Sequence, residues 1–385
     1  MSRWKRLNIG MARVTAFRLA GHGLGVRGAD VVEAAGRCGV QNAPQGAAGL
    51  ALNARVDDAT GTEAAIERDR TLLQAFSLRA APHVFPAADA GVVTLGLLPD
   101  GEEELRDYLP GALQALDKVR LSATDAVELA AAALLEVLDG RAMTKNDLGR
   151  ELGGALTDRL PGHADRKAWR SASWYASGQF LGESIVRFVL PVLSLKGLLW
   201  HGGREGRSPL LRRTGQWLGR EVGRPVRGEL MRRYLRCYGP SNAEEYAEWG
   251  GIGRARARRE FAAEELVEAE GGRWIHAADA DFFAFPPRPE GVRFLPPHDP
   301  YLQTRDRGRL VSDRAWRREI WRSSGNPGVV LSDGEIVATW RPKSTGERLD
   351  LTLRVRGTLP PRPAHAEAVR LAAQRGRALG RITWN

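Results

Sequence analysis

The sequence is short of cysteine: its 385 residues include only Cys38 and Cys237, which lie far apart. A zinc site is recognised in a sequence by cysteines or histidines at short intervals, and a disulfide framework by several cysteines in a small secreted domain. Neither pattern is present, and the seven histidines are scattered. We therefore expect no metal site and no disulfides, and the composition fits a protein of the reducing cytoplasm.

Long hydrophobic runs are also missing. No window approaches the roughly 18 unbroken apolar residues of a membrane span, and residues 1–24 lack the apolar core of a secretion signal. The familiar catalytic motifs are absent too: there is no Gly-rich phosphate loop with its lysine, no nucleophile elbow and no His-Glu-x-x-His. These absences predict no membrane partner, no cofactor, and no nucleotide-driven or metal-driven chemistry.

Lysine is also scarce. The chain has 57 Lys and Arg against 46 Asp and Glu, a net charge of +11, and only six of the cations are lysine. Almost all of the positive charge therefore lies on arginine, whose guanidinium group makes paired hydrogen bonds to phosphate and to guanine. This composition favours a polyanionic partner. The alternative is a GC-rich genome, which enriches arginine codons without any ligand.

The chain is long enough for roughly two to four compact domains. Three segments share one pattern, in which helices are followed by two short extended runs on either side of a turn. This pattern is typical of a winged helix, where a helix-turn-helix precedes a β-hairpin. We expect winged-helix units over residues 1–118, 119–222 and 223–285.

The elements expected in these units follow from hydrophobic period, capping residues and turn residues. In the first unit they are helices over 14–20, 30–37, 45–55 and 63–70, then extended runs over 71–78 and 83–86. In the second they are helices capped by Ser122 and Thr144, a helix over 183–195, and runs over 197–200 and 210–213 around a charged turn. In the third they are helices over 228–238, 241–249 and 254–270, with a hairpin turn at Gly271-Gly272.

The pattern of predicted elements changes near residue 286 from helices to short strands. Short β-rich runs at 292–295, 328–331, 335–341 and 349–355 are separated by turn residues, and a helix over 364–379 follows them. We expect residues 286–385 to form a small β domain on which this last helix docks. The fold class is therefore α+β, with tandem winged-helix units around a C-terminal β domain.

Four segments resemble, in the same order, the AlkZ/YcaQ-type family of winged-helix DNA glycosylases, and they span most of the chain. The segments are GVQNAP at 39–44 with ALNAR at 51–55; LRAAPH at 78–83 with AD at 88–89; YGPS at 238–241 with EWGG at 248–251; and FLPPHDPY at 294–301 with RDR at 305–307 and DGEIVATWR at 333–341. The resemblance implies a C-shaped monomer that holds double-stranded DNA in its concave channel. It also implies hydrolysis of the bond between an alkylated purine and its sugar, without a metal or cofactor.

The family's catalytic signature is Gln, any residue, then Gln or Asp, and these side chains hold the attacking water. Here Gln41 takes the first position and Ala43 the second, so the expected partner is missing. A neutral amide can orient water but cannot accept its proton at ordinary pH. Asn42 should point elsewhere, and an alternative interpretation of Gln41 is that it caps the helix beginning near Gln45.

Arginines at the expected grooves and wings are the candidate DNA contacts. They are Arg254, Arg256, Arg258 and Arg259 at the start of the third unit's long helix, and Arg204, Arg207, Arg273, Arg305, Arg307 and Arg341 elsewhere. The alternative for the helix is a solvated face balanced by glutamates. We interpret Asp299 as a structural acid paired with Arg305 or Arg307, and Trp340 as a core residue.

Three functions remain open. The first is a monofunctional DNA glycosylase acting on alkylated purines in repair or genotoxin resistance. The second is a non-catalytic winged-helix DNA binder, either a regulator or a lesion sensor, favoured by Ala43. The third is a structural protein with degenerate wings, which would not bind duplex DNA even at low salt.

Overall fold

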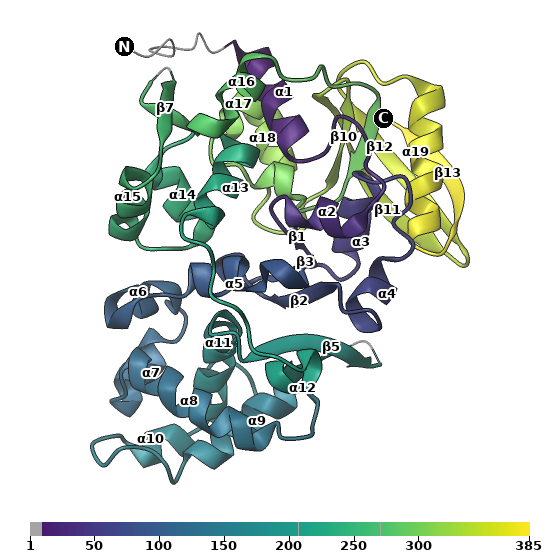
Figure 1. Cartoon of the computed structure of the whole chain (residues 1–385). Coiled ribbons are helices and arrows are strands. Elements are labelled where there is room, and N and C mark those ends of the chain that lie inside the picture. The colour runs from purple at the N-terminus through teal and green to yellow at the C-terminus, as the bar shows by residue number, and fades with distance from the viewer. Residues whose placement is uncertain (1–9, 207, 270) are drawn as a thin grey trace.

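The computed structural model describes residues 10–206, 208–269 and 271–385. Figure 1 shows the N-terminal and C-terminal segments side by side in the upper part of the molecule, while α6 to α12 form the lower part. The chain thus leaves the upper part after α5 and returns to it with α13. No described helix is long and apolar enough to cross a membrane.

One antiparallel sheet joins the two parts. It comprises β1 (Val40–Gln41), β2 (Leu72–Phe76), β3 (Pro82–Pro86), β4 (Met143–Thr144), β5 (Leu199–Glu205) and β6 (Ser208–Arg213), in the order β1-β3-β2-β5-β6-β4. β2 and β5 pair at Gln74 and His201, so strands expected in two separate units share a sheet across the 118/119 boundary. The separation into units at that boundary remains a prediction.

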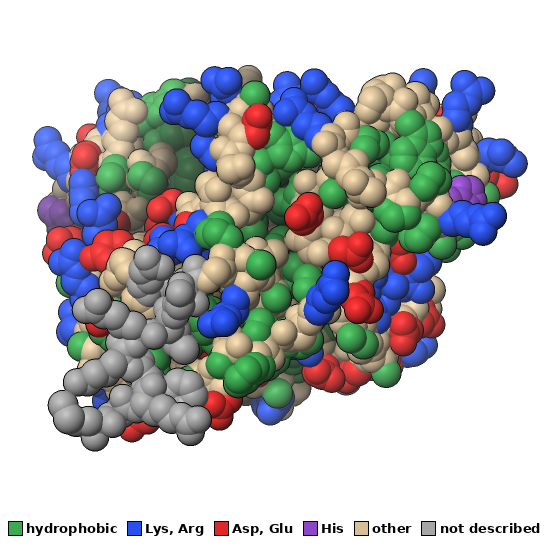
Figure 2. Space-filling model, turned by 90° about the horizontal axis from the view of Figure 1, so that it is seen from above, with side chains coloured by type: hydrophobic (Ala, Val, Ile, Leu, Met, Phe, Trp, Pro, Cys, Tyr) green, Lys and Arg blue, Asp and Glu red, His purple; other side chains and the backbone are tan. Residues whose placement is uncertain are grey.

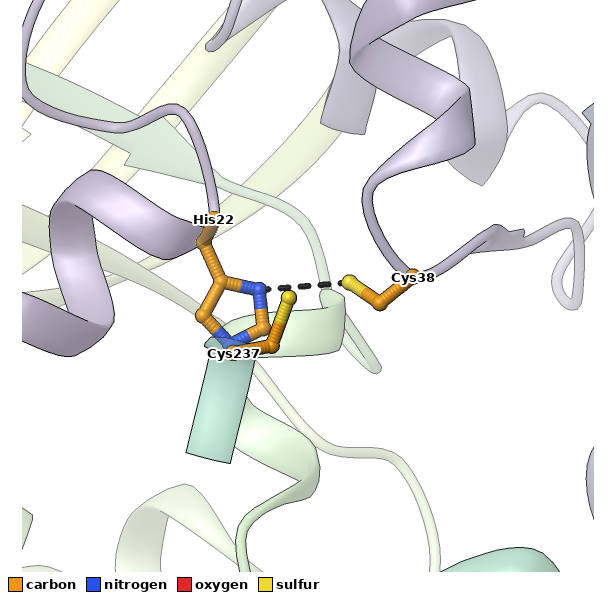
Figure 3. Close-up of side chains that lie close together, drawn as sticks. All are labelled: His22, Cys38 and Cys237. Carbon is orange, nitrogen blue, oxygen red and sulfur yellow. Dashed lines mark hydrogen bonds between the residues drawn. The ribbon is translucent and has the colours of Figure 1, made fainter. Parts of the chain in front are cut away.

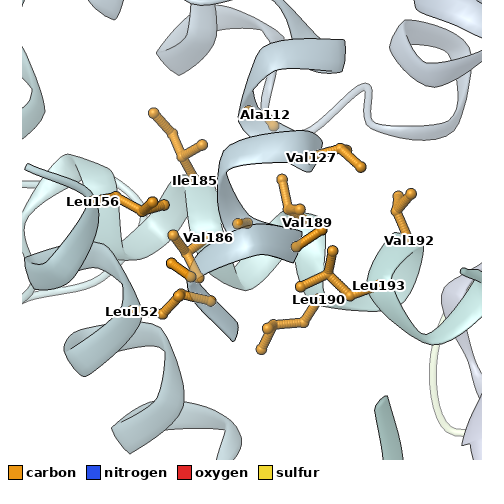
Figure 4. Packing of buried hydrophobic residues seen from close by; sticks show 14 of the residues in the cluster. Ala112, Val127, Leu152, Leu156, Ile185, Val186, Val189, Leu190, Val192 and Leu193 are labelled. Carbon is orange, nitrogen blue, oxygen red and sulfur yellow. The ribbon is translucent and has the colours of Figure 1, made fainter. Parts of the chain in front are cut away.

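The lower part is built on three packed helices, α8 (Ala123–Val137), α9 (Lys145–Leu156) and α11 (Leu181–Leu195). The expected caps are present, since Ser122 and Thr144 accept hydrogen bonds from the backbone N–H groups of Asp125 and Asp147. Figure 4 shows Val127, Leu152 and the apolar side chains of α11 meeting in the core. All residues of α11 except Arg187 and Phe188 are buried, which explains why most of its side chains are apolar.

The segment expected as the third unit begins with three short helices and a hairpin. These are α13 (Glu229–Tyr238), α14 (Ala243–Gly250), α15 (Arg254–Ala262), β7 (Leu266–Ala269) and β8 (Arg273–His276). The expected long helix over 254–270 is wrong, because α15 ends at Ala262 and Leu266–Ala269 pairs with β8. Val267 opposite Ile275 gives this strand cross-strand packing that the helical pattern did not reveal. Gly271 and Gly272, both with positive φ, lie at the expected turn.

The C-terminal sheet comprises β9 (Val292–Leu295), β10 (Gly328–Ser332), β11 (Glu335–Thr345), β12 (Arg348–Val355) and β13 (Ala378–Trp384), in the order β13-β12-β11-β10-β9. The four expected strands are confirmed, but β13 was not expected. The helix α19 (Pro361–Gln374) stops early, since Gly376 takes a left-handed conformation, and the chain returns parallel to β12. Trp340 lies in the core, as expected.

Short helices connect these layers. They are α1 (Met11–Gly21), α2 (Val31–Gly36), α3 (Ala47–Asn53), α4 (Thr62–Glu67), η1 (Leu78–Ala80), η2 (Ala87–Asp89), α5 (Ala90–Val93), η3 (Leu95–Leu97), α6 (Gly101–Tyr108), α7 (Leu113–Val119), α10 (Arg166–Arg170), α12 (Thr214–Leu218), η4 (Ala277–Asp279), α16 (Ala280–Ala284), η5 (Pro300–Gln303), α17 (Arg307–Leu310) and α18 (Arg314–Ile320).

Candidate functional site

Gln41 lies at the end of β1, on the edge of the six-stranded sheet. β1 pairs with β3 so that Gln41 is opposite His83, and the next backbone N–H, of Asn42, donates to the Pro82 carbonyl. His83 is buried, and burial lowers its pKa to about 4, so the ring is neutral at pH 7. The Gln41 side chain is therefore held on a rigid, uncharged strand pair.

The residues after Gln41 do not share its direction. The Asn42 side chain donates to Gln74 and accepts from the backbone N–H groups of Gly46 and Ala48. Asn42 therefore caps the start of α3, and the alternative interpretation of Gln41 as that cap is wrong. The expectation that Asn42 points elsewhere is confirmed.

Gln41 has an amide partner from a distant segment. Gln303, the last residue of η5, donates from Nε2 to Oε1 of Gln41 at 2.8 Å and to the His298 carbonyl at 3.1 Å. Nε2 of Gln41 in turn donates to the Ala43 carbonyl at 3.3 Å. Two amides thus form one fixed pair, and each Gln41 amide atom retains capacity for a further hydrogen bond.

The amide pair lines a pocket of about 310 Å³. The lining residues are Gln41, Arg79, His298, Leu302, Gln303, Arg305, Arg307, Ile320, Trp321, Arg322, Ser323, Ser324, Gly325, Asn326 and Pro327. Among these residues four carry a guanidinium group and none carries a carboxylate. The pocket can therefore attract an anion, but its lining offers no carboxylate base.

Arg79 is the cation nearest the amide pair. It donates to Oε1 of Gln303 and to the Trp249 carbonyl. Partial desolvation and repulsion from Arg305 lower the pKa of Arg79 to about 10, which leaves it charged at pH 7. Arg79 and the following Ala80 both have positive φ. Consecutive non-glycine residues in this region are strained, as is common where a side chain is held for function.

Arg305 and Arg307, together with Arg322, are the other cations that line the pocket. Arg305 pairs with Glu248 at 3.4 Å, and Arg307 lies over the Trp321 ring. Partial desolvation and the neighbouring Arg305 lower the pKa of Arg307, so an arriving anion would relieve this repulsion. Of the ten predicted DNA contacts, these two line the Gln41 pocket.

Among the described residues that line the pocket, His298 is the side chain whose neutral form can accept a proton. Its φ is +63°, a left-handed conformation that residues other than glycine rarely adopt. Partial desolvation, with a smaller contribution from Arg79, lowers its pKa below the ordinary 6.5. The imidazole is therefore neutral at pH 7, and one ring nitrogen can accept a proton.

Asp299 has a structural role, but its expected partners were wrong. Both of its oxygens accept from Arg55, at 2.8 Å each, and its Oδ1 also accepts from the Tyr301 N–H at 3.0 Å. Neither Arg305 nor Arg307 bonds to it. The pair is fully buried and fixes the loop that carries His298 and Gln303 against α3.

The other predicted arginines lie elsewhere. Arg256 donates to Glu260 and to the carbonyls of Gly96 and Leu98, and Arg273 donates to Glu245 and to the Pro240 carbonyl. Arg258 pairs with Glu244 at the surface, and Arg259 and Arg204 are also exposed. Arg207 lies outside the described residues.

Two further arginines differ in what surrounds them. Arg341 donates to the carbonyl of Gly325, a residue of the Gln41 pocket wall. Arg254 lines a different cavity of about 770 Å³ together with six carboxylates. Figure 2 shows basic side chains along the rim of one face, with acidic ones among them. The arginines do not form one continuous stripe on that face.

Sequence reasoning found Gln41, Arg305 and Arg307 but missed Arg79, His298 and Gln303 as site residues. Arg79 and His298 lie within segments that carry the family resemblance, 78–83 and 294–301. Their position inside these two motif segments was the signal that could have identified them. Gln303 lies outside the quoted motifs, so only the fold reveals it.

Residues 35–379 match the family model described as DNA glycosylase AlkZ-like. Among solved structures, the Streptomyces sahachiroi DNA glycosylase AlkZ is similar, with a TM-score of 0.77, 19% identity, and coverage of 98% of this chain and 100% of that one. At this identity the likeness establishes the mixed α+β fold alone. No curated protein matches the sequence.

Proposed function

Because the chain belongs to the AlkZ-like DNA glycosylase family, we propose that it binds double-stranded DNA and hydrolyses the N-glycosidic bond of alkylated purines. The observation that carries this proposal is the Gln41–Gln303 amide pair in a pocket walled by arginine. In this proposal the three helix-and-hairpin segments act as tandem winged helices of a C-shaped monomer. The Gln41 pocket then receives the damaged nucleotide.

The arginine wall supports contact with the DNA backbone. Arg79, Arg305 and Arg307 repel one another in the absence of a ligand, and a phosphate group between them would be bound by several charge-assisted hydrogen bonds. Such contacts fix the register of the duplex without reading its sequence. A backbone phosphate beside the flipped nucleotide would also offset the repulsion between this wall and a cationic purine.

The proposed reaction needs few catalytic groups from the protein. An N-alkylated purine is cationic and leaves readily, so the site must position water and stabilise an oxocarbenium-like sugar. In our proposal Gln41 and Gln303 hold the water by hydrogen bonds, and Gln303 takes the place of the partner missing at Ala43. The neutral His298 ring accepts the proton as the bond to the sugar forms.

The second candidate is a DNA binder or lesion sensor without chemistry. It is favoured by Ala43 and by the absence of a carboxylate among the described residues that line the pocket. Both candidates use the same surface for DNA, so they differ only in product formation.

Base release from a defined duplex separates the two. The full chain is incubated with a duplex carrying one N7-alkylguanine, and abasic sites are detected by alkaline strand cleavage. We expect cleavage at the lesion, reduced on the order of a hundredfold by Gln41→Ala or Gln303→Ala. Gln45→Ala is the matched control, since this glutamine is exposed and outside the pocket. If the wild-type chain binds the duplex but releases no base, the glycosylase proposal is wrong and the lesion sensor is the remaining candidate.

A further inference from the structure

Three side chains of types that can bind a metal, His22, Cys38 and Cys237, meet inside the upper part of the molecule. His22 follows α1, Cys38 follows α2, and Cys237 lies in the last turn of α13 (Figure 3). Their exposed fractions are 0%, 8% and 0%. One ligand atom from each lies within 4.8 Å of the others. The long sequence interval between the cysteines concealed this cluster.

The distances fit a bound transition metal. Nδ1 of His22 lies 3.4 Å from Sγ of Cys38. Two ligands of tetrahedral zinc, with a Zn–S bond of about 2.3 Å and a Zn–N bond of about 2.0 Å, are separated by about 3.5 Å. Figure 3 shows the imidazole nitrogen and both sulfurs directed toward one another. Small side-chain rotations would bring all three atoms into one coordination sphere.

The charge of such a site suits its burial. Two thiolates and a neutral imidazole balance the two charges of Zn²⁺, and binding releases one proton from each thiol to solvent. Two arginines lie close by: Arg55, whose Nε donates to the His22 carbonyl and whose charge is balanced by Asp299, and Arg37, which donates to the Gly21 carbonyl. The carbonyls of Gly21 and Arg37, each 3.7 Å from the Cys237 sulfur, are the candidates for a fourth ligand.

We propose that His22, Cys38 and Cys237 bind one Zn²⁺ that fastens α1, the α2–β1 connection and α13 together. Sulfur and imidazole ligands favour zinc over hard cations such as Mg²⁺. Cys38 is three residues before Gln41 in the sequence, so the metal would anchor the strand that carries the candidate catalytic amide. This role is structural and does not depend on whether the protein cleaves DNA.

Cobalt substitution tests the site without relying on activity. The full chain is purified, depleted of metal under reducing conditions, loaded with Co²⁺ or Zn²⁺, and desalted. We expect about one metal ion per chain, measured by inductively coupled plasma mass spectrometry. We also expect thiolate-to-cobalt absorption in the near ultraviolet, which zinc abolishes.

Variants locate the ligands. Cys38→Ser and Cys237→Ser should each lose the thiolate-to-cobalt band and most of the bound zinc, whereas His163→Gln, at an exposed histidine, should keep both. Chelation should lower the melting temperature of wild type by several degrees and leave that of Cys38→Ser unchanged. A folded, reduced wild-type chain that retains no stoichiometric metal would overturn the proposal. So would a chain isolated with a Cys38–Cys237 disulfide that excludes metal.

Discussion

His298 shows how a single residue can set the pH dependence of the proposed reaction. Its lowered pKa leaves the imidazole neutral above the ordinary 6.5 and for some distance below it. A base that must be neutral acts fully above its pKa and fails as pH falls through it. We therefore expect single-turnover base release to be level near neutrality and to decline only in more acidic buffer.

His298→Asn should remove this acidic decline while lowering the plateau, because the amide cannot accept a proton. The measurement is the rate of abasic-site formation across about pH 5 to 8 on one duplex. Exposed His163→Asn serves as the control and should leave the profile intact. An unchanged profile in His298→Asn would assign the decline to another group.

The Asp299–Arg55 pair offers a test of stability at the residue scale. Both side chains are fully buried, so Asp299→Asn leaves the Arg55 charge without its partner in a dry environment. Breaking such a pair costs about 3–5 kcal/mol of unfolding free energy. Urea unfolding should show this loss. Asp117→Asn should show little, since Asp117 pairs with Arg106 in solvent. Equal losses in the two variants would contradict the structural role of Asp299.

At the scale of elements, the sequence predicted what local chemistry decides. Ser122 and Thr144 cap their helices, and the turns at 271–272 and 332–334 lie where glycine favours them. The errors occurred where tertiary contacts override a local pattern. Leu266–Ala269 fits a helical period but pairs with β8, and Ala378–Trp384 is a strand because β12 offers it an open edge. β8 follows β7 directly across the Gly271-Gly272 turn, whereas β12 is separated from β13 by α19.

Two buried histidines make the joining sheet sensitive to acid. Burial lowers the pKa of both His83 in β3 and His201 in β5 to about 4. The unfolded chain, with a pKa near 6.5, therefore binds more protons than the folded one between these values. The stability that the neutral rings provide is complete above about pH 6.5 and is lost as pH falls toward 4.

His201→Phe should reduce this loss, because phenylalanine packs against Phe76 without titrating. We expect the unfolding free energy of wild type to fall between about pH 7 and pH 5, by an amount on the order of 1–3 kcal/mol for each histidine. The variant should lose about half as much. Urea unfolding at the two pH values measures this fall in unfolding free energy for each protein. An identical fall in wild type and variant would contradict the assignment to His201.

At the scale of the whole molecule, the candidate site is assembled from segments that only the complete fold brings together. Gln41, Arg305 and Arg307 were predicted because motifs point to them individually. Gln303 could not be, since its hydrogen bonds with Gln41 and Arg79 depend on docking the segment after β9 against the six-stranded sheet. That docking rests on buried polar links such as Arg55 to Asp299, and Tyr238 to the Pro300 carbonyl.

The same assembly predicts which arginines meet DNA. Arg307 faces a pocket without carboxylates, whereas Arg254 shares its cavity with six of them, and phosphate would be repelled there.

The logarithm of the duplex affinity should fall linearly with the logarithm of salt concentration, with a slope reduced by about one for each phosphate contact removed. Arg307→Ala should reduce this slope and Arg254→Ala should not. Fluorescence anisotropy over a salt series measures both, with Arg141→Ala, at an exposed pair with Glu151, as the control. If Arg254→Ala alone changed the slope, the duplex would lie along α15, away from Gln41, and the pocket could not act on it.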